Sequence, residues 1–161
     1  PIFGGYEPPL SDCILQGKYA AWPEMLELIG CMLGTKVKGC VPPSTLVVPV
    51  PMPRFRKLFR RIDHAAVIAK EVAKVAGLRS RKCLIRKEST PQAAMTASGR
   101  RALKCNTMRV RHLARIRGYP VLLIDDVLTT GRTLEVACDT IRKAGASCVM
   151  VAVAGVTALP R

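Results

Sequence analysis

A pair of adjacent carboxylates, followed closely by a run of hydroxyl groups, is the feature of this sequence best suited to chemistry. The residues after Asp125 and Asp126 include Thr129, Thr130, Gly131, Arg132 and Thr133. Hydroxyl donors, a glycine that lets the backbone approach closely and the positive end of a following helix together suit a phosphate group. Neighbouring carboxylates repel each other, so they need hydroxyl donors or a cation such as Mg²⁺. Single residues of these types are common in solvated turns and helix caps, but the complete string favours a phosphate site.

The patterns around this cluster are typical of an α/β protein. The apolar residues 119–124 predict a strand buried on both faces, and residues 133–144 predict a helix closed by Gly145. Further strands are predicted over residues 45–50, 83–85, 107–111 and 148–153, and further helices over residues 22–33 and 63–76. Strands that alternate with helices predict right-handed βαβ crossovers and a parallel sheet. Ligands bind beyond the carboxyl ends of such strands, where the acidic pair stands.

Glycines and one aspartate set the expected ends of the two earlier helices. The apolar positions between Trp22 and Leu33 recur every three or four residues, so the first helix is expected to precede Gly34. Asp63 is the expected N-cap of the second helix, and Gly77 is its expected end. The polar residues 87–99 lack a period and are the expected site of a mobile loop.

The positive charge is concentrated in the middle of the chain. The formal net charge is +15, and residues 54–117 hold 19 of the 26 lysines and arginines but only three acids. Such a concentration repels itself and favours a polyanionic partner, such as nucleotide phosphates, pyrophosphate or nucleic acid. A basic face that only keeps the protein in solution is an equally favoured alternative.

Length and composition favour one domain with a packed core. The chain has 161 residues, of which 49% are hydrophobic. The longest run of small or apolar residues, 148–156, is far shorter than the roughly 20 residues of a spanning helix, so no membrane span is expected. No secretory leader opens the sequence, and Pro1 in place of Met suggests that the chain continues a longer gene product.

The seven cysteines are scattered and show no Cys-x-x-Cys spacing. This arrangement favours neither a disulfide framework nor a zinc site formed by the chain alone. We therefore expect reduced, mostly buried thiols in a cytoplasmic protein.

Three motifs together resemble the ComF-type branch of the type I phosphoribosyltransferase family. The first motif is the segment 121–133, with its two acids and Thr-Thr-Gly-x-Thr, which resembles the motif that binds 5-phosphoribosyl-1-pyrophosphate (PRPP). The others are the proline-rich segment 47–53 before a basic stretch, and Thr90-Pro91-Gln92 before two arginines. Chains of this branch usually begin with a four-cysteine zinc ribbon, which this sequence lacks. They also often carry an Asn-Gln pair near residues 61–64.

The resemblance covers about residues 15–156 and implies both a fold and a set of site residues. The implied fold is α/β, a parallel sheet of about five strands flanked by helices, with a small hood over residues 1–40 and a core domain over residues 41–161. The implied ribose-binding and catalytic acids are Asp125 and Asp126, which would contact Mg²⁺ only through ribose or water. The 5′-phosphate would be wrapped by Thr129, Thr130, Gly131, Arg132 and Thr133. Pyrophosphate would contact Arg54, Arg56 and Lys57, and the flexible loop 87–104 would bring Arg100 and Arg101 to the reacting centre.

These expectations support three functions. The first is a Mg²⁺-dependent transferase that takes PRPP or a nucleoside monophosphate and moves a phosphoribosyl group with release of pyrophosphate. The second is a module without catalysis that binds single-stranded DNA or competence proteins, although Phe55 and Phe59 are the only aromatic residues of the basic middle. The third is a nucleotide-sensing regulator. A homo-oligomer is expected in each case.

Overall fold

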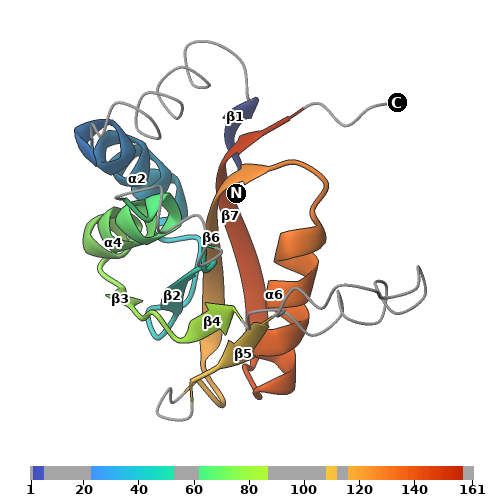
Figure 1. Ribbon diagram of the computed structural model, residues 1–161. Helices are drawn as coiled ribbons and strands as arrows, with labels where there is room; N and C mark the ends of the chain where they lie inside the picture. Colours follow the sequence, from blue (N-terminus) through green and yellow to red (C-terminus); the bar gives the residue numbers. More distant parts are fainter. Residues whose placement is uncertain (1, 6–22, 53–61, 87–107, 112–115, 158–161) are drawn as a thin grey trace, which may run out of the picture.

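A parallel sheet of five strands lies at the centre of the molecule (Figure 1). The computed structural model describes residues 2–5, 23–52, 62–86, 108–111 and 116–157. The order across the sheet is β1-β7-β6-β2-β3, with bounds Ile2–Gly5, Cys148–Val156, Pro120–Leu128, Leu46–Pro49 and Arg79–Ser80. The described helices are α2 (Pro23–Val37), α4 (His64–Ala76) and α6 (Arg132–Lys143), and β4 (Leu84–Arg86) pairs with β5 (Met108–Val110) as a separate antiparallel hairpin. The predicted α/β class with a central parallel sheet is confirmed.

Successive residues of β6 face two different cores. Leu122 and Ile124 pack among the residues of α2 and α4, whereas Val121 and Leu123 pack among those of α6 and the β4–β5 hairpin. All four side chains are completely buried. The sheet is therefore a middle layer with both faces covered, which explains why its strands read as continuous apolar runs rather than alternating ones.

The connections that follow β2 and β6 run in opposite directions across the sheet. From β2 it passes through α4 to β3, and from β6 it passes through α6 to β7. The two strands are themselves neighbours, with Leu46 opposite Val121 and Pro49 opposite Ile124. The carboxyl ends of β2 and β6 thus lie at a topological switch point, which is where open α/β sheets leave a crevice for a ligand.

Helices α2 and α4 lie side by side because two glycines of α2 leave room for α4 (Figure 1). A Cβ atom on Gly30 would lie 2.7 Å from the Cβ of Glu71, and one on Gly34 would lie 2.9 Å from the Cβ of Val75. The prediction that the first helix precedes Gly34 is wrong, since α2 continues to Val37. Gly34 is a packing residue here, and the helix tolerates it because close helix contact offsets its low helix propensity.

The predicted ends of α4 are confirmed. The carboxylate of Asp63 accepts a hydrogen bond from the backbone N–H of Ala66 at 3.4 Å. Gly77 follows the helix with φ of 70°, the left-handed conformation that a glycine adopts at little cost. The Asp63 cap holds the amino end of α4, where His64 lies.

Two strands extend further than the sequence predicts, and the two short edge strands, β1 and β3, were not predicted. β6 continues through the acidic pair to Leu128, since Asp125 and Val127 lie opposite Val153 and Gly155 of an equally extended β7. β1 pairs in parallel with β7. Within the predicted hood segment 1–40, β1 is thus an edge strand of the sheet and α2 packs on it, while residues 6–22 lie outside the described residues. The division of the chain near residue 40 stays a prediction.

The described cysteines are free, but most of them are not buried. Cys83 is buried, Cys31 and Cys138 are partly buried, and Cys40 and Cys148 are exposed. The prediction of mostly buried thiols is therefore wrong for these five. Cys40 lies in the turn after α2, and Cys148 is the first residue of β7, so neither reaches the cores. Of the helices in the described part of the chain, none is long and apolar enough to cross a membrane.

Candidate functional site

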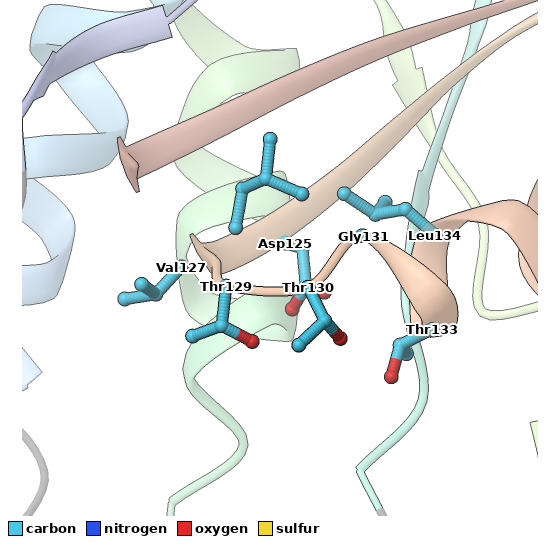
Figure 2. A pocket seen from close by; sticks show the side chains of 8 residues that line it. Asp125, Val127, Thr129, Thr130, Gly131, Thr133 and Leu134 are labelled. Carbon is cyan, nitrogen blue, oxygen red and sulfur yellow. The ribbon is translucent and has the colours of Figure 1, made fainter. Parts of the chain in front are cut away.

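A small open pocket lies where β6 passes into α6 (Figure 2). The space in and in front of it is about 240 Å³, open solvent at its mouth included. It is lined by Asp125, Val127, Leu128, Thr129, Thr130, Gly131, Thr133 and Leu134. Most of these residues are polar or contribute backbone from a loop. The pocket therefore offers hydrogen-bond donors to an anion such as a phosphate group.

Gly131 gives the loop its shape. Its φ of 74° and ψ of −15° are left-handed, and it is the residue from which α6 begins. Its carbonyl accepts from the N–H of Glu135 at 2.9 Å, whereas no described side chain caps the helix. The first N–H groups of a helix have no partner within it, so they and the positive end of α6 are available to an anion in the pocket.

The start of the loop is held by the end of the neighbouring strand. The carbonyl of Leu128 accepts hydrogen bonds from the backbone N–H of Thr157 at 3.0 Å and from its hydroxyl at 3.3 Å. Thr129 and Thr130 then follow as exposed residues, and Figure 2 shows their side chains projecting from the loop beside Asp125. The loop is thus anchored at both ends, by β7 and by α6, which favours a preformed site.

Asp125 is the acid of the pair that faces the pocket. Burial and the nearby negative charge of Asp126 raise the pKa of Asp125 from 3.8 to about 7. The N–H of Asp126, which donates to Oδ1 of Asp125 at 2.9 Å, and the positive charge of Arg86 oppose that rise. The carboxyl group can therefore accept or release a proton near neutral pH.

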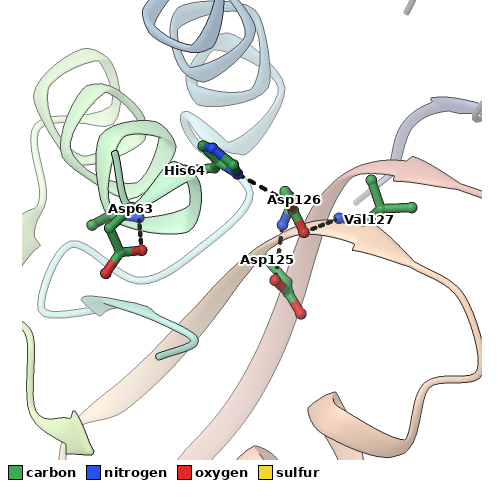
Figure 3. Close-up of polar contacts among 6 residues, drawn as sticks. Asp63, His64, Asp125, Asp126 and Val127 are labelled. Carbon is green, nitrogen blue, oxygen red and sulfur yellow. Dashed lines mark hydrogen bonds and ion pairs between the residues drawn. The ribbon is translucent and has the colours of Figure 1, made fainter. Parts of the chain in front are cut away.

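Asp126 lies on the other side of the strand, toward α4 (Figure 3). Its Oδ1 accepts from the N–H of Val127 at 2.8 Å, and its Oδ2 lies 3.5 Å from Nδ1 of His64. The exposed fraction of its side chain is 22%, against 2% for that of His64. Asp126 does not line the pocket described above. The two adjacent acids thus have different surroundings.

The structure unites most of the predicted phosphate residues but not Arg132. Thr129, Thr130, Gly131 and Thr133 line the pocket with Asp125. The side chain of Arg132 is 64% exposed and lies 4.0 Å from the carboxylate of Glu135, so it is directed along α6 and is not part of the lining. The predicted pyrophosphate residues and loop cations lie outside the described residues, namely Arg54, Arg56, Lys57, Arg100 and Arg101.

Comparison with protein families shows which family the chain belongs to. Residues 63–155, more than half of the chain, match the family of the phosphoribosyl transferase domain. The chain belongs to this family. A search of curated proteins finds no match. The matched segment of this phosphoribosyltransferase domain begins at the cap of α4 and ends in β7, so it contains the acidic pair and the whole pocket loop.

Several solved structures share this fold. One is the allosteric regulatory enzyme of purine biosynthesis, with 20% identity and a TM-score of 0.58 over 80% of this chain and 25% of that one. Another is the glutamine PRPP amidotransferase from B. subtilis in complex with ADP and GMP, with 18% identity and a TM-score of 0.57 over 80% and 25%. The purine phosphoribosyltransferase from Pyrococcus horikoshii Ot3 has 15% identity and a TM-score of 0.51 over 83% and 73%. The present phosphoribosyltransferase domain spans about a quarter of the length of the first two.

Two residues near the acids were not predicted to act at the site. Arg86 of β4 is close enough for its charge to act on Asp125. His64 is the first residue of α4, and its ring faces Asp126. No local pattern gives such contacts, because the residues lie about 40 and 60 positions from the acids in the sequence of this phosphoribosyltransferase domain. The signal that could have found them is a basic or imidazole side chain at the end of an element beside the acidic strand.

The conformation of Gly131 leads to a first prediction. We expect Gly131→Ala to lower the free energy of unfolding by about 1 kcal/mol, because a left-handed residue with a Cβ is strained. Gly39→Ala is a matched control, since Gly39 has φ of 77° and open space around it. Urea unfolding should give similar losses for both, and only Gly131→Ala should weaken phosphate-ester binding in calorimetry. Equal binding by the two variants would contradict a role for this loop.

Proposed function

We propose that this domain binds PRPP or a nucleoside 5′-phosphate and transfers the phosphoribosyl group with release of pyrophosphate. The observation that carries the proposal is the pocket at the switch point of the sheet, where Asp125 stands beside a loop of threonines and the start of α6. A 5′-phosphate would take the loop hydroxyls and N–H groups, and ribose hydroxyls would donate to Asp125. That the B. subtilis amidotransferase structure was solved with ADP and GMP is consistent with a nucleotide in a site of this fold.

Transfer of the phosphoribosyl group requires that developing charge be stabilised at two places. As the bond from C1 to pyrophosphate breaks, positive charge develops on the ribose ring and negative charge on the leaving group. A carboxylate below the ring stabilises the first charge, which is the role we assign to Asp125. Five cations that lie outside the described residues are proposed to neutralise the second, namely Arg54, Arg56, Lys57, Arg100 and Arg101.

A magnesium ion fits this site only as a partner of the substrate. Among the described residues, no group of three or more His, Cys, Asp or Glu side chains gathers to hold a metal. Mg²⁺ keeps several waters and is usually bound by one or two carboxylates together with substrate phosphates. Asp125 in the pocket suits that arrangement, in contact through water or through the ribose. When bound, the ion would neutralise charge on pyrophosphate.

Further details of this function are proposed on the resemblance to the ComF-type branch. They are a place in that branch, a cytoplasmic setting and a homo-oligomeric state. The sequence resemblance over residues 47–53 and 121–133 supports the first of these.

The loop threonines provide the direct test. PRPP with Mg²⁺ at about 100 times its Kd should stabilise the wild-type protein by roughly 2.7 kcal/mol and raise its melting temperature by several degrees. Thr130→Val should weaken binding about tenfold or more, because it removes a hydrogen bond to a charged group. Thr35→Val, at an exposed position of α2 whose hydroxyl bonds only the carbonyl of Cys31 among the described residues, is the matched control. An unchanged wild-type melting curve at millimolar PRPP would reject the proposal.

A second candidate function rests on exposed positive charge around the β4–β5 hairpin. Arg81 and Lys82 precede β4 and are exposed. The N–H of Arg111, which follows β5, donates to the carbonyl of Cys83, so these basic residues lie near one another. Arg109 is exposed as well, opposite Ile85. Such a surface favours binding of single-stranded DNA, or of acidic competence partners, by a domain without catalysis. DNA affinity that falls steeply with salt would support this candidate, and no binding at low salt would reject it. PRPP binding without release of pyrophosphate in the presence of any acceptor base would instead favour the nucleotide-sensing regulator.

A further inference from the structure

The buried ring of His64 has a nitrogen that, among the described residues, only Asp126 is placed to satisfy. His64 is the first residue of α4 and is 1% exposed. Its Nδ1 is buried and makes no regular hydrogen bond within the described part of the chain, yet it lies 3.5 Å from Oδ2 of Asp126 (Figure 3). A buried polar nitrogen without a partner is unfavourable, so a hydrogen bond from Nδ1 to this carboxylate is favoured.

The other oxygen of Asp126 is already occupied. Oδ1 accepts from the N–H of Val127 at 2.8 Å, which fixes the plane of the carboxylate on the α4 side of β6. Val127 and the residues that follow it line the pocket. A group that holds Oδ2 therefore also holds the backbone from which the phosphate loop starts.

We propose that His64 is a positioning residue that donates its Nδ1–H to Asp126 and thereby fastens the carboxyl end of β6 to the amino end of α4. In this role Asp126 orients the strand end, and Asp125 is left as the acid that faces the ligand. The inference rests on the proposed function for its effect on binding, but the hydrogen bond itself can be tested without any ligand.

The chemistry of the two side chains predicts which nitrogen carries the proton. A neutral imidazole has one N–H donor and one bare acceptor nitrogen, and a carboxylate only accepts. Nδ1 must therefore be protonated in the wild-type protein. In Asp126→Asn the amide oxygen is kept at the Val127 N–H, so the NH₂ group faces His64. That arrangement requires a bare Nδ1, with the proton on Nε2.

Long-range proton–nitrogen correlation spectra of the ligand-free protein give the first readout. The chain has two histidines, so a His112→Gln variant leaves His64 as the single imidazole. We expect a protonated Nδ1 in the wild type and a bare Nδ1 in Asp126→Asn. A bare Nδ1 in the wild type, or the same proton position in both proteins, would overturn the proposal. A purely structural role for the ring predicts no change of tautomer.

Binding of PRPP with Mg²⁺ by calorimetry gives the second readout. His64→Leu should weaken binding about tenfold, as expected for one lost hydrogen bond to a charged group, and His64→Asn, whose amide nitrogen can take the place of Nδ1, should restore most of it. In the Asp126→Ala background, where the hydrogen bond is already lost, His64→Leu should change affinity less than twofold, because the residue acts through Asp126. Equal losses in both backgrounds would overturn the proposal. A wild-type protein that does not bind PRPP would reject the proposed function alone, since the spectra still decide the hydrogen bond.

Discussion

Asp125→Asn should make the protein more stable above neutral pH while it weakens ligand binding. The pKa of Asp125 is about 7 in the folded protein, against the ordinary value of 3.8 that we take for the unfolded chain, so the folded state binds the proton more tightly. The contribution of this group to stability is therefore fully present below pH 4 and is lost as the pH rises through 7. Asparagine cannot ionise, and its oxygen can still accept from the N–H of Asp126. The variant should gain at most about 4 kcal/mol over the wild type at pH 8 and nothing at pH 3.5.

Urea unfolding as a function of pH measures this difference. Asp139→Asn is the control, because the side chain of Asp139 is 64% exposed and pairs only weakly with Arg142 at 3.3 Å. Its effect should stay within about 0.5 kcal/mol across the same range. A constant difference between wild type and Asp125→Asn from pH 4 to pH 8 would show that the carboxyl group is ionised throughout. In calorimetry the same variant should bind PRPP about tenfold more weakly, since a charged acceptor for ribose hydroxyls is lost.

The double substitution Gly30→Ala with Gly34→Ala should destabilise the fold by about 3 kcal/mol. Alanine favours an isolated helix over glycine by about 1 kcal/mol at each position, so propensity alone predicts a gain. The new methyl groups would lie 2.7 Å from the Cβ of Glu71 and 2.9 Å from the Cβ of Val75, with backbone of α4 close behind them. Because neither contact is with the end of a flexible side chain, α2 must move away from α4, and overpacking of this kind costs more than the propensity returns.

Thr35→Ala on the exposed side of α2 is the control for helix propensity. We expect it to leave the free energy of unfolding unchanged or to raise it by a few tenths of a kcal/mol. Thermal and urea unfolding of both variants should separate the effect of helix propensity from that of overpacking between α2 and α4. A double alanine variant as stable as the control would show that the two helices do not meet at these glycines.

The sequence predicted those parts of the fold that depend on local pattern. The strand before the acids and the helix between Asp63 and Gly77 follow from apolar periodicity and capping chemistry, and both are observed. The loop of threonines was expected at the carboxyl end of a buried strand, and the pocket is there. These features need no knowledge of distant contacts.

What the sequence could not predict depends on partners far away in the chain. Gly34 resembles a helix terminator until α4 is placed against it. The short strand Ile2–Gly5 pairs with β7, some 150 residues later. Asp125 and Asp126 look equivalent in sequence, because their difference arises from His64 on one side and the pocket on the other.

Because side chains alternate between the two faces of β6, the adjacent residues 125 and 126 are subject to different structural constraints. Residue 125 must suit the ligand in the pocket, and residue 126 must suit His64 of α4. A change of substrate could therefore be reached through the first position while the second stays untouched. Loss of a single residue upstream within the strand would exchange the two assignments at once, since consecutive strand positions point in opposite directions.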